Sequence, residues 1–170
     1  DKLLGGPQAG IVAGDAGLVT RIKAEPFFRA VRCDKLILTV LQECIDDYLR
    51  SRGEGRPDIP VLNFLGLPLE DLRARAEAIV AALDGLPARC VIVDTTSQTG
   101  GGTMPRAEFP SLALEIEPTG MGIEKLAGIL RAADPAVIGY VHENRFLLNL
   151  RTVFPSQDEA LTSVLRETLQ

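Results

Sequence analysis

The sequence contains few of the residues that build metal and hydrolytic sites. It has one histidine, His142, and three cysteines that do not form a Cys-x-x-Cys spacing. Cysteines in this number and arrangement indicate neither a disulfide framework nor a zinc site. A Ser-His-Asp hydrolase would rest on His142 alone, without a nucleophile-elbow motif, and His142 falls in an expected turn facing solvent. We therefore expect neither a metal centre nor a hydrolytic triad.

Long apolar runs are also absent. No segment approaches the length that crosses a bilayer, and no secretory signal is visible, so we expect a cytoplasmic protein without a membrane partner. The 170 residues are nevertheless 46% hydrophobic, which is enough to bury a sizeable core.

The charge is unevenly distributed. The formal net charge of −5 argues against a general nucleic-acid surface. Residues 1–56 carry nine basic and eight acidic side chains, whereas residues 57–170 carry nine basic and fifteen acidic ones. An anionic ligand is therefore expected in the first third of the chain.

The first third is predicted to be mainly helical. We expect a short buried strand at Ala9–Ala13, a helix at Gly17–Ala24, and a helix that Asp34 caps and that runs to about Arg50. The segment Ser51–Pro60 is the strongest linker signal, because glycine, proline and charged residues alternate there. It divides the chain into two expected domains, residues 1–56 and 57–170.

The second domain is predicted to be α+β. Its expected elements form an antiparallel sheet covered by helices on one face. The expected helices are Val61–Leu65 (one turn), Leu69–Leu83, Ile123–Ala133 and Gln157–Leu169; the expected strands are Cys90–Val93, Leu112–Ile116, Ala136–Val141 and Arg145–Thr152, the last two as a hairpin.

The first ten residues, Asp1–Gly10, are the most informative segment. Lys2 precedes two glycines and a proline, and a lysine desolvated beside such a turn has the lowered pKa that a Schiff-base lysine needs. The alternative is an exposed lysine before an ordinary loop. Gly5, Gly6 and Gln8 either bind an anion through a glycine-rich nest or only form a tight turn.

Arginines supply the other candidate sites. Arg29 and Arg32 are three residues apart, so on a helical turn both side chains project to one side, as an anion clamp or as a solvated basic face. Arg151 lies on an expected strand near the C-terminus and binds a carboxylate or phosphate, or pairs structurally. The loop Thr95–Pro105 is rich in hydroxyls and glycines, and it either closes over a substrate or only connects strands.

Several segments resemble the bacterial selenocysteine synthases, which are L-seryl-tRNA(Sec) selenium transferases. The resemblance is strongest in Asp-Lys-Leu-Leu-Gly-Gly-Pro-Gln-Ala-Gly and continues in order along nearly the whole chain. The other matching segments are residues 29–35, 97–105, 137–140 and 147–153. This family depends on pyridoxal 5′-phosphate (PLP) and has fold type I, the α/β fold of aspartate aminotransferase. The resemblance implies that residues 1–56 end the large PLP-binding domain of a longer protein and that residues 57–170 are its small α+β domain.

The resemblance also implies roles for the candidate residues. Lys2 would be the Schiff-base and proton-transfer lysine. Asp1 would tune Lys2 or orient a leaving group, although an exposed terminal acid is the alternative. The resemblance places Gly5, Gly6 and Gln8 at the cofactor phosphate.

The remaining roles concern the substrates. Arg29 and Arg32 match arginines that hold selenophosphate. Arg151 would meet selenophosphate or the tRNA end, because seryl-tRNA carries its α-carboxylate as an ester.

The implied reaction converts seryl-tRNA(Sec) to selenocysteinyl-tRNA(Sec) through a dehydroalanyl intermediate, in a homo-oligomer. The 170 residues alone are expected to be inactive. One alternative is a related PLP-dependent lyase or transferase acting on a small amino acid or amino sugar. The other is a non-catalytic scaffold domain.

Overall fold

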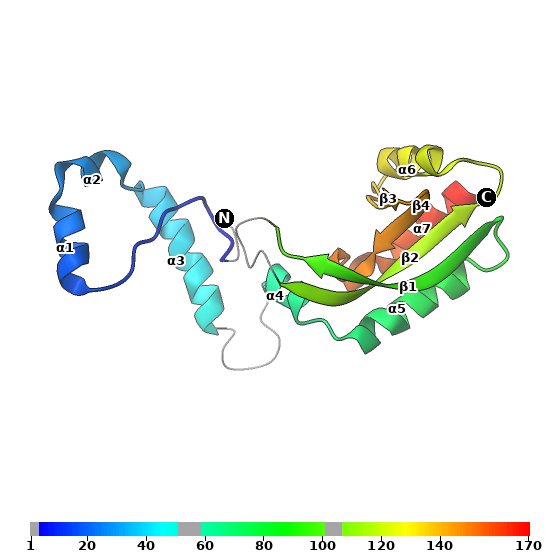
Figure 1. Ribbon diagram of the computed structural model, residues 1–170, viewed down its shortest axis with the longest axis horizontal. Coiled ribbons are helices and arrows are strands. Elements are labelled where there is room, and N and C mark those ends of the chain that lie inside the picture. The colour runs from blue at the N-terminus through cyan, green and yellow to red at the C-terminus, as the bar shows by residue number, and fades with distance from the viewer. Residues whose placement is uncertain (1–3, 51–58, 101–106) are drawn as a thin grey trace. The chain divides into compact units, whose positions relative to one another are not determined.

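The chain folds into two compact units. The computed structural model describes residues 4–50, 59–100 and 107–170, and its units are Asp1–Asn63 and Phe64–Gln170 (Figure 1). The division falls within helix α4 (Pro60–Leu65), beyond the expected linker at Ser51–Pro60, most of which lies outside the described residues. That these units are the two expected domains, residues 1–56 and 57–170, stays a prediction.

The first unit is helical. It contains α1 (Ala16–Ala24), α2 (Pro26–Val31) and α3 (Lys35–Arg50). Asp15 caps α1 by accepting a hydrogen bond from the Leu18 backbone N–H at 3.0 Å, and Asp34 caps α3 by accepting one from Ile37 at 2.9 Å. These caps satisfy helix N–H groups that have no partner within the helix, and the Asp34 cap confirms the predicted start of α3.

The expected buried strand at Ala9–Ala13 is wrong. These residues adopt no regular structure, and Ile11 and Val12 are 59% and 66% exposed. Within the described residues, no strand pairs with this segment, and backbone groups in a strand need such a partner.

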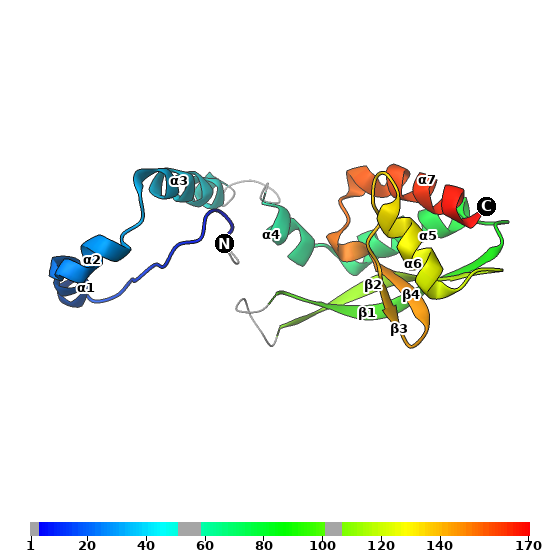
Figure 2. The same cartoon turned by 90° about the horizontal axis from the view of Figure 1, so that it is seen from above.

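The second unit contains an antiparallel four-stranded sheet, as the sequence predicts. Its strands are β1 (Ala88–Gln98), β2 (Glu108–Pro118), β3 (Tyr140–His142) and β4 (Arg145–Asn149), in the order β1-β2-β4-β3. Helices α5 (Leu69–Ala82), α6 (Ile123–Ala132) and α7 (Asp158–Leu169) lie on one side of the sheet (Figure 2).

The strands differ from their expected lengths. Thr95 to Gln98, expected in a loop, continue β1, because β1 pairs with β2 from Ala88 opposite Pro118 to Gln98 opposite Glu108. The hairpin is tighter than expected, since Glu143 and Asn144 both have positive φ angles of 48° and 59° and form a two-residue turn. Residues 150–152, expected to end β4, form the 3-10 helix η1. A second 3-10 turn, η2 (Pro155–Gln157), leads into α7.

The core of the second unit lies between the sheet and the helices. Alternation along β2 turns Leu112, Leu114 and Ile116 toward the helices, and all three are 0% exposed. Leu72, Ala76 and Ile79 of α5 pack against this layer, as their helical spacing predicts. Residues of α6, β4 and α7 complete the core: Leu126, Leu130, Phe146, Leu148, Leu161 and Leu165.

Removing a core side chain should therefore destabilise the protein strongly. We expect Leu114→Ala to lower the free energy of unfolding by about 2–5 kcal/mol, because it deletes methyl groups from a filled interior. Urea unfolding followed by far-UV circular dichroism measures this change. Ile138→Ala, at a side chain that is 66% exposed, is the control and should cost less than about 1 kcal/mol.

Candidate functional site

The predicted lysine site lies at the edge of what the structure describes. Asp1 and Lys2 fall outside the described residues, and the segment that follows them begins at Leu4. Gly5 and Gly6 both have φ angles of 73°, in the left-handed region that glycine enters without a steric penalty. The glycine pair thus forms a turn that most other residues would strain.

The two glycines differ in their surroundings. A Cβ atom built on Gly6 would lie 2.8 Å from Sγ of Cys44 on α3, whereas no described heavy atom lies within 4 Å of one built on Gly5. Gln8 is exposed, while Pro7 and Ala9 are half-buried. The segment therefore lies close to the Cys44 side chain at Gly6, while Gly5 is half-buried with space beside it and the amide of Gln8 is exposed.

Arg29 and Arg32 lie at the junction of α2 and α3. Arg29 is in the last turn of α2, and both arginine residues are exposed. The helical argument for their pairing is wrong, because α2 ends at Val31 and Arg32 has an extended backbone (φ −65°, ψ 143°). Two residues further along the chain, Asp34 caps the start of α3.

Arg151 lies in the interior of the second unit instead of on a strand surface. It is in η1 and only 4% exposed. Its Nη1 donates to the carbonyls of Phe64 at 2.8 Å and Leu67 at 3.0 Å, and its Nη2 donates to the carbonyl of Pro110. Desolvation by burial lowers the pKa of Arg151. The structure therefore shows the structural pairing that the sequence left open.

His142 and the loop Thr95–Pro105 do not add to the site. The His142 side chain is 64% exposed, as expected, and its Nε2 lies 4.0 Å from a carboxylate oxygen of Glu143. Residues 101–106 of the loop are outside the described residues.

Among the described residues, no three His, Cys, Asp or Glu side chains are grouped as metal ligands, and no helix is long and apolar enough to span a membrane.

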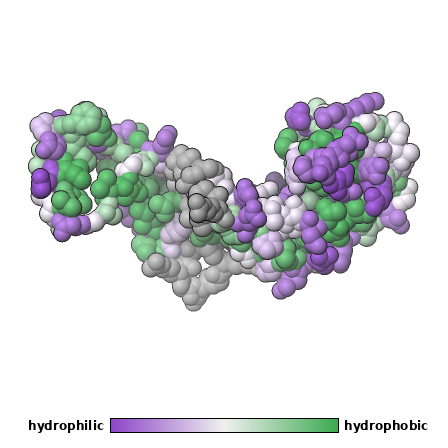
Figure 3. All heavy atoms as spheres, viewed as in Figure 1, coloured by the Kyte–Doolittle hydropathy of each residue, from purple (hydrophilic) through white to green (hydrophobic). Residues whose placement is uncertain are grey.

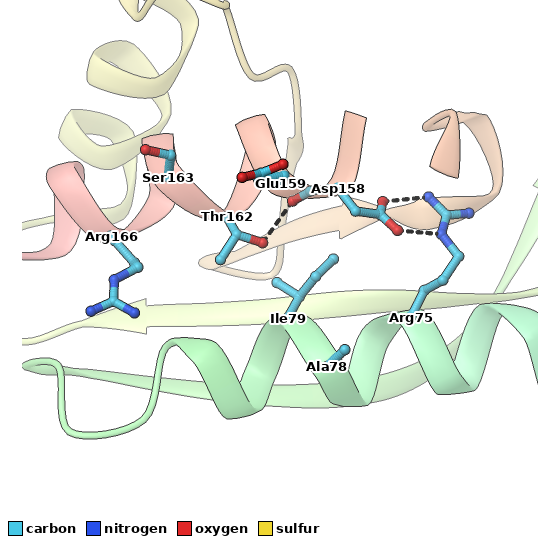
Figure 4. A pocket seen from close by; sticks show the side chains of 8 residues that line it. All are labelled: Arg75, Ala78, Ile79, Asp158, Glu159, Thr162, Ser163 and Arg166. Carbon is cyan, nitrogen blue, oxygen red and sulfur yellow. Dashed lines mark hydrogen bonds and ion pairs between the residues drawn. The ribbon is translucent and has the colours of Figure 1, made fainter. Parts of the chain in front are cut away.

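Sequence reasoning missed an ion pair between two helices. Arg75 of α5 and Asp158 of α7 form two hydrogen bonds of 2.7 Å, from Nε and Nη2 to the two carboxylate oxygens. Figure 4 shows these side chains facing each other in a groove of about 370 Å³ between the helices. Arg166 and Glu159 also line the groove, so its charges balance. We interpret the pair as structural; its partners are too far apart in sequence for any spacing signal.

A second missed network lies on the sheet face away from the helices. Asn149 of β4 donates from Nδ2 to Ser97 Oγ at 3.0 Å and accepts from Ser111 Oγ at 2.8 Å. Nearby, Glu115 is 8% exposed and lies 3.2 Å from Arg145 and 3.6 Å from Arg89. Alternation along β2 is the signal that could have found Ser111 and Glu115, because it places both opposite the core residues.

Comparison with known proteins adds the family. The model of the family described as SelA, L-seryl-tRNA selenium transferase, matches residues 1–154. L-seryl-tRNA(Sec) selenium transferase of Moorella thermoacetica is 40% identical over 173 residues, which cover 100% of this chain and 37% of that protein. The enzyme of that name from Aquifex aeolicus is 34% identical, over 99% of this chain and 37% of that protein. The chain thus spans little more than a third of these relatives.

Among solved structures, D-glucosaminate-6-phosphate ammonia-lyase is similar to this chain with a TM-score of 0.49 and 17% identity. The match covers 83% of this chain and 33% of that one.

If Arg151 is structural, its loss should destabilise the protein. We expect Arg151→Met to lower the free energy of unfolding by about 3 kcal/mol, because buried carbonyls lose their donors. Arg151→Lys should recover only part of this loss, since an ammonium lacks the planar fork. Urea unfolding measures both, with exposed Arg131→Met as the control. A stable Arg151→Met protein that loses only activity would contradict the structural role.

Proposed function

The chain belongs to the L-seryl-tRNA selenium transferase family, and from this premise we propose that it serves the conversion of seryl-tRNA(Sec) to selenocysteinyl-tRNA(Sec), with selenophosphate as the selenium donor. The observation that carries the proposal is the family match over residues 1–154, which includes the Lys2 segment and both exposed arginines. The activity would belong to a protein of the relatives' length, of which this chain spans 37%.

PLP is the cofactor that this proposal requires. When bound, it withdraws electron density from the substrate Cα and so eases loss of the Cα proton and of the β-hydroxyl. The described residues fit its phosphate, because Gly5 and Gly6 form a glycine turn of the kind that binds anions and Gln8 is exposed. Lys2 would hold the cofactor covalently and, once released, move the proton at Cα, with Asp1 beside it to tune its charge.

Selenophosphate binding falls to Arg29 and Arg32. Both are exposed and stand at the α2–α3 junction, where their guanidinium groups can reach a ligand from solvent. A guanidinium presents a planar fork of donors that matches phosphate oxygens. The two arginines lie in the first third of the chain, the part without an excess of acidic side chains.

The buried state of Arg151 favours seryl-tRNA over a free amino acid as substrate. An enzyme acting on free amino acids needs a cation for the α-carboxylate, and Arg151 is the expected one. Its guanidinium is engaged by backbone carbonyls in the interior. Seryl-tRNA has no free α-carboxylate, so its conversion does not require Arg151 at the substrate.

We also propose a fold-type-I arrangement in a cytoplasmic homo-oligomer, with residues 1–56 in the large domain and 57–170 as the small domain. None of the described residues in α1, α2 or α3 is buried. Figure 3 shows apolar surface over these helices, which include exposed Phe27, Leu36 and Leu38. Apolar surface of this kind supports assembly with further protein.

The cofactor assignment can be tested by chemical trapping. Borohydride reduction of the PLP-loaded protein of full length should give a pyridoxyl adduct on Lys2, found by peptide mapping. Lys2→Arg should abolish that adduct, whereas Lys23→Arg should leave it in place. An adduct on any other lysine would contradict the assignment.

The proposed binding of selenophosphate by Arg29 and Arg32 can be tested by kinetics. We expect Arg29→Ala and Arg32→Ala each to raise the KM for selenophosphate about tenfold, because each removes a charge-assisted hydrogen-bond donor. Arg21→Ala, on exposed α1, is the charge-matched control and should change KM less than about twofold. Unchanged selenium transfer after removal of both arginines would show that the clamp lies elsewhere.

A further inference from the structure

The contact between Gly6 and Cys44 joins the glycine-rich segment to α3. A Cβ atom at position 6 would lie 2.8 Å from the Cys44 Sγ and 3.7 Å from the Cys44 Cβ. The first distance is below any real contact of a Cβ atom, and the second is an ordinary van der Waals distance. Among the described atoms that surround this Cβ position, the thiol sulfur therefore lies nearest.

Cys44 lies on the half-buried face of α3. Ile37, Leu41 and Tyr48 share its helical face and are half-buried like it. Burial, followed by the proximity of Cys44, raises the pKa of Tyr48. Cys44 is therefore half-buried and close to Tyr48, on a helix that Asp34 caps at its start.

We propose that Cys44 is a positioning residue that sets the place of the glycine-rich turn at Gly5 and Gly6. The inference rests on the proposed role of this turn at the cofactor phosphate and adds the feature of the chain that holds the turn in place. Gly5 and Gly6 are adjacent and both in the left-handed region. A displaced Gly6 therefore displaces the backbone N–H groups of the turn, and small displacements of groups that position a reactant are costly.

Gly5 provides a matched control within the same turn. Its φ angle equals that of Gly6, so alanine at either position is strained in the same way. Only alanine at position 6 meets the sulfur, because position 5 is open among the described residues. The two substitutions therefore separate backbone strain from the contact with Cys44.

The test is a double-mutant comparison in the protein of full length. Gly6→Ala should weaken PLP binding, followed by absorbance, about tenfold more than Gly5→Ala, because it overfills the contact. Cys44→Ala should recover most of that difference in Gly6→Ala and recover nothing in Gly5→Ala. If the effects of Gly6→Ala and Cys44→Ala simply add, the proposal is overturned.

A second readout does not depend on the cofactor. In the protein without PLP, Gly6→Ala should raise the rate of Cys44 alkylation by iodoacetamide severalfold, measured by peptide mapping, whereas Gly5→Ala should leave it unchanged. The alkylation result stands even if trapping finds PLP on another lysine, so it separates failure of the contact from failure of the Lys2 assignment. If Gly6→Ala raises the alkylation rate as expected but no variant changes PLP binding, the positioning role is overturned.

A reverse substitution covers the case in which Gly6→Ala does not fold. Cys44→Met enlarges the contact from the helix side and should weaken PLP binding as Gly6→Ala does. Glu43→Met, at the exposed neighbouring position of α3, is its control and should bind PLP like the parent. Equal PLP binding by Cys44→Met and Glu43→Met would contradict the proposal.

Discussion

The second unit depends on the buried guanidinium of Arg151. One side chain donates to the carbonyl of Phe64 in the last turn of α4, to that of Leu67 before α5 and to that of Pro110 in β2. It thereby ties the entry of the unit to its central strand and to η1. Carbonyls buried there would otherwise lack donors, which costs more free energy than a hydrogen bond normally contributes. The packing of α5 on β2 follows, because the chain entering α5 is already fixed.

The two units differ in how much of their apolar side-chain surface they bury within themselves. The second has a continuous core between sheet and helices, with Leu72, Leu114 and Leu130 at 0% exposure. The first has capped helices without a buried residue among those described in α1 to α3, and its apolar side chains face outward. The residues proposed for chemistry belong to this first unit. Their geometry therefore depends on local devices, such as helix caps and the contact of Gly6 with Cys44.

The sequence correctly predicted features that depend on residues close together in the chain. Asp34 was recognisable as a cap, helical spacing located the buried face of α5, and alternation located β2. The strand predicted at Ala9–Ala13 is wrong because an apolar segment does not form a strand without a strand to pair with. The pairing of Arg29 with Arg32 on one helix is wrong because α2 ends at Val31, before Arg32. The Arg75–Asp158 pair and the carbonyls around Arg151 come from segments distant in sequence, so no spacing could reveal them.

The glycine-rich segment shows how a local pattern acquires its meaning from tertiary contact. From the sequence, Gly5 and Gly6 are equivalent, and both serve a turn or an anion nest. In the structure they share a backbone conformation but only Gly6 touches α3, while Gly5 is open. Gly6 is thus constrained by α3, while Gly5 has space beside it. This difference follows from a single sulfur atom, and it links α3 to the turn proposed to bind the cofactor phosphate.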